Sequence, residues 1–211
     1  DDFKGHEDIL NLVKNKTPKY GNDDDDYADD IMVSVFNEYK DYITGRPTTR
    51  GGVYHVDMLP TTCHVYFGDV MIASPNGRLA HIPLSEGISP EKGADINGPT
   101  AVVKSCSKMN HCETGGTLLN QKFTPAAIAG EKGIDNLAAL IRSYFAMNGH
   151  HMQFNVIDRQ TLIEAQKNPE EYKELIVRVA GYSDYFRNLD KPLQNEIIER
   201  TEQSFGGCGC C

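Results

Sequence analysis

The sequence lacks long hydrophobic runs, and it lacks an excess of basic residues. It has no apolar run of about eighteen residues or more, the length that a membrane-spanning helix needs, and residues 1–6 are not a basic-then-apolar leader. Lysine and arginine number 21 against 30 acidic residues, which gives a formal net charge of -9. Nucleic acid is a poor partner, because a phosphate backbone requires clustered cationic side chains. We therefore expect a cytoplasmic protein, without membrane contact, that binds small molecules or proteins.

A disulfide framework is also lacking. The six cysteines comprise three in the body of the chain and three in the last four positions: Cys63, Cys106, Cys112, Cys208, Cys210 and Cys211. We expect the first three to be buried or half-buried thiols, because free cysteine packs as a small hydrophobe. The last three could bind a soft metal, form cross-links or resemble a prenylated tail, although such a tail needs basic neighbours that are absent. Our preferred interpretation of residues 206–211 is a flexible extension or a cloning scar.

Enough apolar residues are present, at 39%, for a real core, and their spacing predicts both helices and strands. Helices are expected at 1–14, 23–45, 100–109, 135–147, 158–168, 168–171 and 190–198, and strands at 53–58, 63–67 and 152–156. The helix at 23–45 carries an apolar stripe made of Tyr27, Ile31, Val35, Tyr39 and Tyr42. In the strand at 152–156, apolar residues alternate with Gln153 and Asn155, and Asp158 can cap the helix that follows. Interleaved helices and strands indicate an α/β fold.

The segment at 177–183, Val-Arg-Val-Ala-Gly-Tyr-Ser, is neither amphipathic nor a polar loop. Taken alone, Gly181 could simply be a helix-ending glycine. However, Arg178-Val179-x-Gly181-Tyr182 matches the signature of the glycyl radical enzymes, and residues 115–123, 150–157, 162–166 and 168–170 resemble the C-terminal region of that family in order and spacing. The chain is therefore identified as a member of the glycyl radical enzyme family, related to pyruvate formate-lyase.

The resemblance implies a role for Gly181 and a set of partners. In the family, an activating enzyme that uses S-adenosylmethionine and an iron–sulfur cluster removes a glycine hydrogen. The radical then passes to a cysteine, and the resulting thiyl radical attacks the substrate to cleave a carbon–oxygen bond or, as alternatives, a carbon–carbon or carbon–nitrogen bond. Gly181 would store the radical, because a Cα without a side chain can become planar. Arg178, Val179 and Tyr182 would support the loop, with ordinary packing as the alternative, and Val177, Val179 and Tyr182 would shield it from oxygen and water. An anaerobic life, a small-molecule substrate and a homodimer of the full-length enzyme are also implied.

The family's catalytic cysteine lies in a Gly-Cys-x-x loop, commonly Gly-Cys-Val-Glu, and no such loop occurs here. Since the family fold is a ten-stranded α/β barrel, we expect residues 1–124 to be a partial barrel segment and residues 125–205 to be the glycyl radical domain. The chain would then be inactive alone. The alternatives are a non-catalytic repair subunit that replaces an oxygen-cleaved C-terminus in a partner enzyme, and an unrelated α/β binding domain with a chance motif.

The loop at 83–90 and the helix start at 97–101 resemble the dehydratase and lyase branch of the family, nearest to dehydratases of trans-4-hydroxy-L-proline and next to those of glycerol and propanediol. Ser85 and Glu86 could line a substrate pocket, although polar loop residues are more often merely solvated. No substrate-binding residue can be assigned.

Two further patterns could indicate a metal site, and we assign neither of them to one. An EF-hand loop that starts at Asp23 would need glycine and glutamate where the chain has Ala28 and Ser34, so the acidic run is interpreted as a solvated helix start. His150 and His151 are adjacent on a predicted strand and would point to opposite faces, so one metal ion could not use both.

Overall fold

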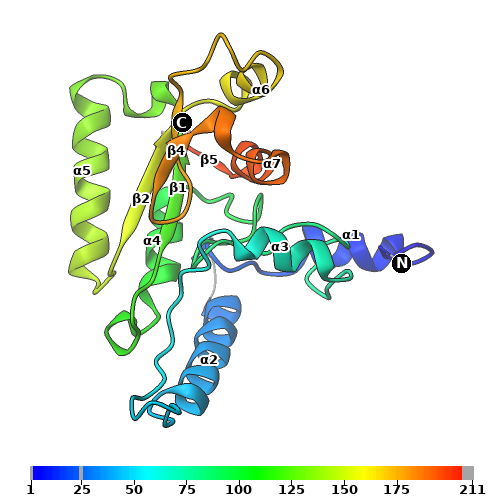
Figure 1. Ribbon diagram of the computed structural model, residues 1–211, viewed down its shortest axis with the longest axis vertical. Helices are drawn as coiled ribbons and strands as arrows, with labels where there is room; N and C mark the ends of the chain where they lie inside the picture. Colours follow the sequence, from blue (N-terminus) through cyan, green and yellow to red (C-terminus); the bar gives the residue numbers. More distant parts are fainter. Residues whose placement is uncertain (1, 24–25, 206–211) are drawn as a thin grey trace, which may run out of the picture.

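The structure, a computed structural model, describes residues 2–23 and 26–205, which form helices around a small parallel sheet (Figure 1). The α-helices in this part of the chain are α1 (Glu7–Asn15), α2 (Asp26–Ile43), α3 (Cys63–Val70), α4 (Pro99–Ser107), α5 (Gly130–Ala146), α6 (Arg159–Lys167) and α7 (Lys191–Glu199). The strands are β1 (Leu119–Phe123), β2 (Met152–Val156), β3 (Ile176–Arg178), β4 (Ser183–Tyr185) and β5 (Glu202–Gln203). Single-turn 3-10 helices lie at His111–Glu113, Pro125–Ile128 and Phe186–Asn188.

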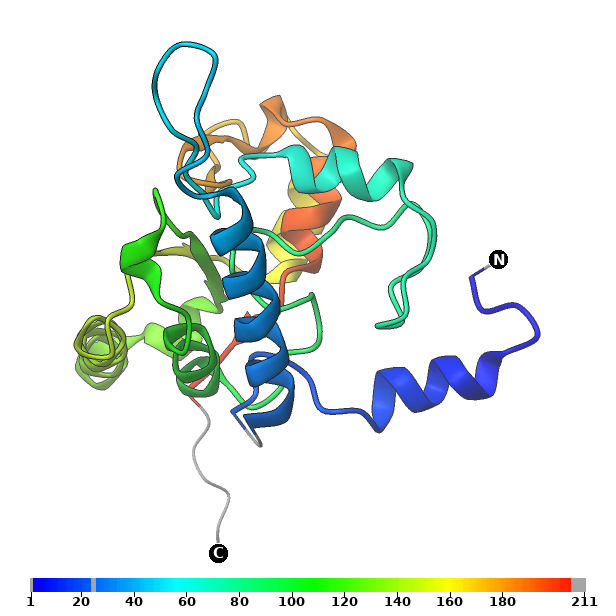
Figure 2. The ribbon, with the colours of Figure 1, turned by 90° about the horizontal axis from the view of Figure 1, so that it is seen from below.

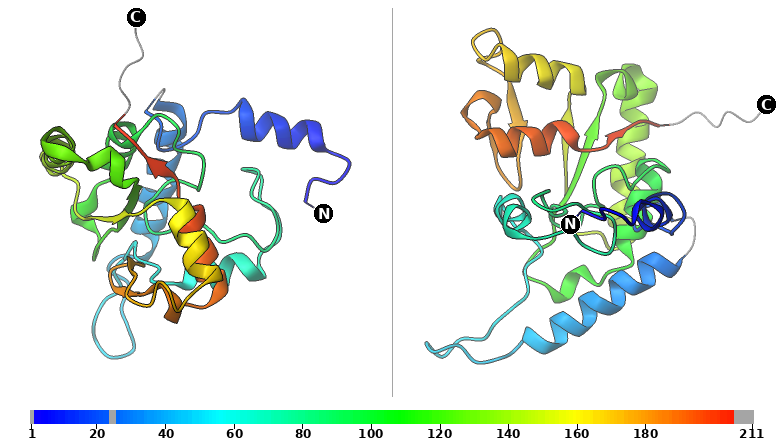
Figure 3. Two further views of the ribbon diagram at one scale, coloured as in Figure 1. Left: turned by 90° about the horizontal axis from the view of Figure 1, so that it is seen from above. Right: turned by 90° about the vertical axis from the view of Figure 1, so that its right-hand side faces the viewer.

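The main sheet has three parallel strands in the order β2-β1-β5. Leu119 pairs with Met152 at one end of the β1–β2 ladder, and Phe123 pairs with Val156 at the other. Parallel neighbours need a crossover connection, and α5 provides it between β1 and β2. Helix α5 lies on one face of the sheet, and α6 and α7 lie on the other face (Figures 1 and 3). All five residues of the central strand β1 are therefore buried.

Two apolar clusters stabilise this arrangement. The first joins the sheet to α2, α4 and α5, and its buried members include Phe36, Val102, Val103, Cys106, Phe123, Leu140 and Tyr144. The second lies between α6, α7 and the β3–β4 hairpin, and its buried members include Leu162, Val177, Val179, Phe186, Leu193 and Ile197. The second cluster fixes the hairpin on the α6–α7 side of the sheet.

Local sequence signals predict several elements correctly. Pro99 occupies the first turn of α4, where its missing N–H costs nothing. Helix α7 forms where it is expected, and α5 does so as well but begins at Gly130, five residues before the predicted start. Asp158 caps α6, since its Oδ1 accepts a 2.8 Å hydrogen bond from the Thr161 amide. The strand expected at 152–156 is β2.

Other predicted elements are wrong. The strand expected at 63–67 is helix α3, because His64 and Gly68, one helical turn apart, bury one face. A Cβ at Gly68 would lie 2.4 Å from the backbone of Pro83, so this close approach prevails over β propensity. The segment at 53–58 forms only isolated bridges at Val53 and Met58. Residues 168–171 form turns rather than a helix, and the first helix begins at Glu7 instead of at residue 1.

The apolar stripe that predicts α2 is exposed. Its members have exposed fractions of 49% to 66%: Tyr27, Ile31, Val35, Tyr39 and Tyr42. The opposite face carries the buried Phe36. Helix α1 has no buried residue and lies at the edge of the molecule (Figure 2). Within residues 2–23 and 26–205, no helix is both long and apolar enough to cross a membrane.

Candidate functional site

The segment that carries the glycine signature is a β-hairpin. Strands β3 and β4 pair antiparallel with Arg178 opposite Ser183, and residues 179–182 form the connecting loop. The Val179 amide donates to the Tyr182 carbonyl at 2.9 Å, which closes the loop. Gly181 lies within this loop with φ +78°, in the left-handed region that side chains disfavour. The nearest atoms to a Cβ placed there belong to Leu59 and Leu118, at 3.7 Å, so the backbone conformation, not crowding, requires glycine.

Strand β2 holds this hairpin through its polar side chains. The Asn155 side-chain amide donates to the Arg178 carbonyl and accepts from the Arg178 backbone N–H, both at 2.8 Å, which reproduces the pattern of a neighbouring strand. Two residues earlier on β2, the Oε1 of Gln153 accepts from the Gly181 amide at 3.2 Å. Its Nε2 lies 3.3 Å from the Val179 carbonyl oxygen. The alternation at 152–156 predicts the strand, but the polar face is the buried one.

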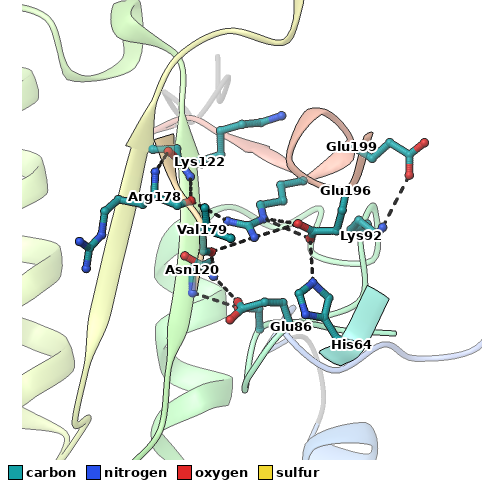
Figure 4. A network of polar contacts seen from close by, with 12 residues as sticks. His64, Glu86, Lys92, Asn120, Lys122, Arg178, Val179, Glu196 and Glu199 are labelled. Atoms are coloured by element: carbon teal, nitrogen blue, oxygen red, sulfur yellow. Dashed lines mark hydrogen bonds and ion pairs between the residues drawn. The ribbon is translucent and has the colours of Figure 1, made fainter. Parts of the chain in front are cut away.

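Asn120 and Glu86, from two other segments, extend this contact inward (Figure 4). Asn120 on β1 accepts a hydrogen bond from Gln153 through Oδ1 and donates one to the Glu86 carboxylate through Nδ2. Its Nδ2 also lies 3.3 Å from the Val179 carbonyl oxygen. Ser89 donates to the same Glu86 oxygen at 3.3 Å. Glu86 is thus buried in a polar network and is not a solvated loop residue, whereas Ser85 is exposed.

Four side chains hold the hairpin through its backbone, and we call them the clamp: Asn120, Gln153, Asn155 and Arg200. Arg200, which directly follows α7, is the charged member. Its Nη2 donates to the Val179 carbonyl at 3.0 Å, and its Nη1 donates to the Arg178 carbonyl at 3.3 Å. Its guanidinium also pairs with Glu196 at 2.8 Å. His64 Nε2 lies 3.7 Å from the other Glu196 oxygen, which is an ion-pair distance rather than a hydrogen bond (Figure 4). The carbonyl of Val179 therefore faces three donors: the two side-chain amides and the guanidinium.

Burial and neighbouring charge set the protonation of these groups. Burial raises the pKa of Glu86 to about 7, against the opposing effects of the Arg200 charge and the Asn120 hydrogen bond. Burial would raise the pKa of Glu196 as well, but the Arg200 charge and the His64 contact bring it down to about 2. Burial lowers the pKa of Lys122, which donates to the Ile198 carbonyl at 2.8 Å, to about 8. A glutamate whose pKa is raised by burial to about 7 therefore lies two side chains, Asn120 and Gln153, away from Gly181.

The predicted site residues have different environments. Gly181 is exposed in the described part of the chain, Val179 is fully buried, and Tyr182 is 37% exposed. The side chains of Val177 and Val179 thus belong to the buried apolar cluster, and Tyr182 lies at the surface. The Arg178 side chain donates to Ser183 at 3.2 Å, across the base of the hairpin.

Five residues that contact or support the loop were missed by the sequence reasoning: Asn120, Gln153, Asn155, Glu196 and Arg200. For Gln153 and Asn155 a signal exists, because two large amides on one face of a short strand suit a binding surface. For the other three, only the fold brings distant segments together.

The cysteines are partly as expected. Cys106 is buried, whereas Cys63 and Cys112 are exposed, so the prediction of a buried or half-buried thiol is wrong for these two. Cys63 is exposed because it begins α3, whose buried face is formed by His64 and Gly68. The three terminal cysteines lie outside the described residues. Among residues 2–23 and 26–205, no three His, Cys, Asp or Glu side chains are grouped as a metal ion would need.

The fold and the site together define an α/β protein whose focus is a main-chain glycine, presented by a hairpin and held through its backbone. Comparison with known proteins identifies the family. A glycine radical family model matches residues 84–187, and a pyruvate formate lyase-like model matches residues 1–68. The chain therefore belongs to the glycyl radical enzymes. The match to the glycine radical model ends before Glu196 and Arg200, which nevertheless hold the loop.

Individual relatives agree with this assignment. The chain is 69% identical over 203 residues to the trans-4-hydroxy-L-proline dehydratase of Clostridioides difficile, a match that covers 96% of this chain and 26% of that enzyme. The crystal structure of hydroxyproline dehydratase from that organism, with trans-4-hydroxy-L-proline bound, superposes with a TM-score of 0.93 over 97% of this chain and 26% of that chain, again at 69% identity. The glycerol-bound B12-independent glycerol dehydratase of Clostridium butyricum also gives 0.93, at 48% identity and with the same two coverages.

These relatives confirm the predicted α/β class and the likeness to the C-terminal portion of the barrel enzymes. The chain spans only about a quarter of their length. The division at residues 124 and 125 stays a prediction. Strand β1 on one side of that boundary pairs with β2 and β5 on the other side.

Proposed function

We propose that Gly181 stores a glycine-centred radical and that the chain is the radical-bearing part of a glycyl radical lyase of the dehydratase type. One observation carries the proposal: the glycine of the family signature lies in a hairpin loop, with positive φ and its amide held by a buried side chain. Once one Cα hydrogen atom has been removed, the Gly181 nitrogen and carbonyl can share the unpaired electron. A Cβ would obstruct the planar carbon and strain the loop.

The partners in this proposal derive from the family. An activating enzyme with S-adenosylmethionine and an iron–sulfur cluster would remove the hydrogen atom. A cysteine on the rest of the barrel would take over the radical and start cleavage of a carbon–oxygen bond in the substrate. A cytoplasmic location, strictly anaerobic work and a homodimer of the full-length enzyme belong to the same proposal.

The proposed substrate is trans-4-hydroxy-L-proline. The support is the difference in identity between relatives: 69% to the dehydratase of that compound, against 46% to the indoleacetate decarboxylase of Tractidigestivibacter scatoligenes. The repair-subunit alternative is less well supported. The match to the pyruvate formate lyase-like model over residues 1–68 lies far upstream of the glycine loop and exceeds what a replacement loop needs.

Electron paramagnetic resonance after anaerobic activation tests the proposal. A glycine-centred doublet is expected in the wild-type protein, and its splitting should collapse when the protein is made with glycine deuterated at Cα. The Gly181→Ala variant should give no such signal. A signal of equal intensity in Gly181→Ala, or none in the activated wild type, would refute the assignment.

A further inference from the structure

Two buried side chains, Gln153 and Asn120, connect Gly181 to the buried carboxylate of Glu86. The Gly181 amide donates to Gln153 Oε1 at 3.2 Å, Gln153 Nε2 donates to Asn120 Oδ1, and Asn120 Nδ2 donates to Glu86 Oε2. The exposed fractions of Glu86, Asn120 and Gln153 are 4%, 9% and 4%. The three residues come from a loop, β1 and β2, so the connection depends on the folded sheet.

The direction of these hydrogen bonds is set at the carboxylate end. An amide side chain offers donors on one side and an acceptor on the other, whereas an ionised carboxylate can only accept. Asn120 must therefore turn its NH2 group toward Glu86, which leaves its oxygen for the NH2 group of Gln153. Gln153 then presents its own oxygen to the Gly181 amide. If both amides were reversed, the Gln153 NH2 group would face the Gly181 N–H group, donor against donor.

We propose that Gln153 is a positioning residue for the glycine radical and that Glu86, acting through Asn120, fixes the orientation of the Gln153 amide. This inference rests on the proposed function of Gly181. An acceptor on the Gly181 N–H group holds the peptide plane in one direction and increases electron density on the nitrogen that shares the unpaired electron. The series of hydrogen bonds from Glu86 through Asn120 and Gln153 to Gly181 therefore acts on the electronic state of the radical, besides holding the loop.

The rest of the clamp does not duplicate this contact. Asn155 bonds only to the backbone of Arg178, and Arg200 bonds to the carbonyls of Arg178 and Val179. In the described part of the chain, the acceptor for the Gly181 N–H group is the side-chain oxygen of Gln153. The Asn120 and Gln153 amides also approach the Val179 carbonyl at 3.3 Å, longer than a typical hydrogen bond, so the charge-assisted contact with Glu86 dominates.

The groups that face Glu86 allow it to be ionised at mildly basic pH. Arg200 lowers the pKa of Glu86 and Glu196 raises it, and Asn120 and Ser89 both donate to its Oε2. With burial included, the pKa is about 7, so the carboxylate predominates at pH values about one unit higher. Experiments at mildly basic pH therefore test the ionised state.

Glu86→Gln is the informative variant, because it keeps the shape and removes the acceptor-only group. By hydrogen exchange at mildly basic pH, we expect the amide of Gly181 to exchange about five- to tenfold faster than in the wild type, the loss of about one hydrogen bond. After activation, the hyperfine coupling of the radical to the Gly181 N–H proton should change as well. Gln160→Leu is the control for a lost amide, since Gln160 is exposed on α6 and its side chain donates to Glu164, away from the glycine loop. It should change neither quantity.

A double variant tests the direction of the hydrogen bonds between Glu86 and Gly181. In Glu86→Gln with Asn120→Asp, the acceptor-only group moves one step closer to Gly181, and the carboxylate introduced on β1 can accept from the amides on both sides. Gln153 would again present its oxygen to Gly181. We expect the double variant to recover at least half of the lost exchange protection and to restore the wild-type N–H coupling, which a general packing defect would not allow.

The outcomes separate this inference from the proposed function. If the activated wild type shows no glycine doublet, the proposed function fails. If the doublet is present but Glu86→Gln matches Gln160→Leu in both exchange and coupling, only the positioning inference is overturned. A double variant that is no better than Glu86→Gln also overturns it.

Discussion

Gly181 is required for its backbone conformation and not for lack of space. Its φ is +78°, and a Cβ added there would meet its nearest atoms at an ordinary contact distance of 3.7 Å. We expect Gly181→Ala to fold and to lose about 1–2 kcal/mol of unfolding free energy through left-handed strain, measured by urea denaturation.

Gly45 supplies the matched control for that substitution. Its φ is +82°, and a Cβ added there would meet no atom within 4 Å. Gly45→Ala should therefore lose a similar amount of stability and keep the radical. A Gly181→Ala chain that fails to fold while Gly45→Ala is stable would contradict the view that only backbone strain is at stake.

The positive charge of Arg200 compensates the negative charge of Glu196, whose carboxylate is buried. Glu196 is 2% exposed and hydrogen bonds to the guanidinium of Arg200 through both oxygens. Arg200→Met should lower the unfolding free energy by about 3–5 kcal/mol, because an unpaired charge remains buried. In chemical denaturation, the double variant Glu196→Gln with Arg200→Met should recover part of that loss. Equal stability of the single and double variants would contradict the proposed pairing.

Glu86 predicts a pH dependence of stability. Its pKa is about 7 in the fold against an ordinary value of 4.5, so the folded chain binds a proton more tightly than the unfolded chain. Stability should therefore fall as pH rises from 4.5 to 7, by at most about 3 kcal/mol at about 1.4 kcal/mol per pKa unit. The Glu86→Gln curve should lack that fall. Identical pH profiles, measured by urea denaturation across this range, would rule out the raised pKa.

At the scale of elements, β2 acts as a support for the hairpin. Its Asn155 side chain makes both hydrogen bonds that a strand would make to Arg178. Asn155→Ala should speed amide exchange in β3 and β4 by about one to two orders of magnitude, for a loss of about 1–3 kcal/mol.

Val156 on the same strand gives the control for β2. It is 45% exposed, and Val156→Thr keeps the β-branched shape, so exchange in the hairpin should stay unchanged. If both substitutions accelerate exchange equally, β2 supports the hairpin by packing and not through the Asn155 side chain.

Elements with strong local signals could be predicted from the sequence, as the cap at Asp158 and the proline that starts α4 illustrate. Helix α3 could not, because the contact that selects it joins Gly68 to Pro83. The glycine of the site came from resemblance to a family. Its clamp was missed because residues 86, 120, 153 and 200 meet only when the sheet and α7 are in place.

At the scale of the molecule, the described chain assembles a glycine loop and offers no catalytic cysteine loop of the family type. The exposed stripe on α2 and the exposed residues of α3 are surfaces that the rest of a barrel could cover. We expect the isolated chain, with activating enzyme and trans-4-hydroxy-L-proline under strict anaerobiosis, to give no dehydration product. Product formation, detected by chromatography, would contradict this division of roles.

A repair role makes a different prediction for the same chain. As a replacement part, it should bind a glycyl radical enzyme that has been clipped by oxygen and restore its turnover. Failure to bind in a pull-down with the clipped enzyme, together with no recovered activity, would exclude that role.

The central claim is that the unpaired electron resides on Gly181, and backbone cleavage by oxygen locates it most directly. The wild-type protein, activated anaerobically and then exposed to air, should break at residue 181, with both fragments identified by mass spectrometry. Activated Gly181→Ala should stay intact under the same exposure. An uncut wild-type chain after a verified radical signal, or a break at another residue, would contradict the account.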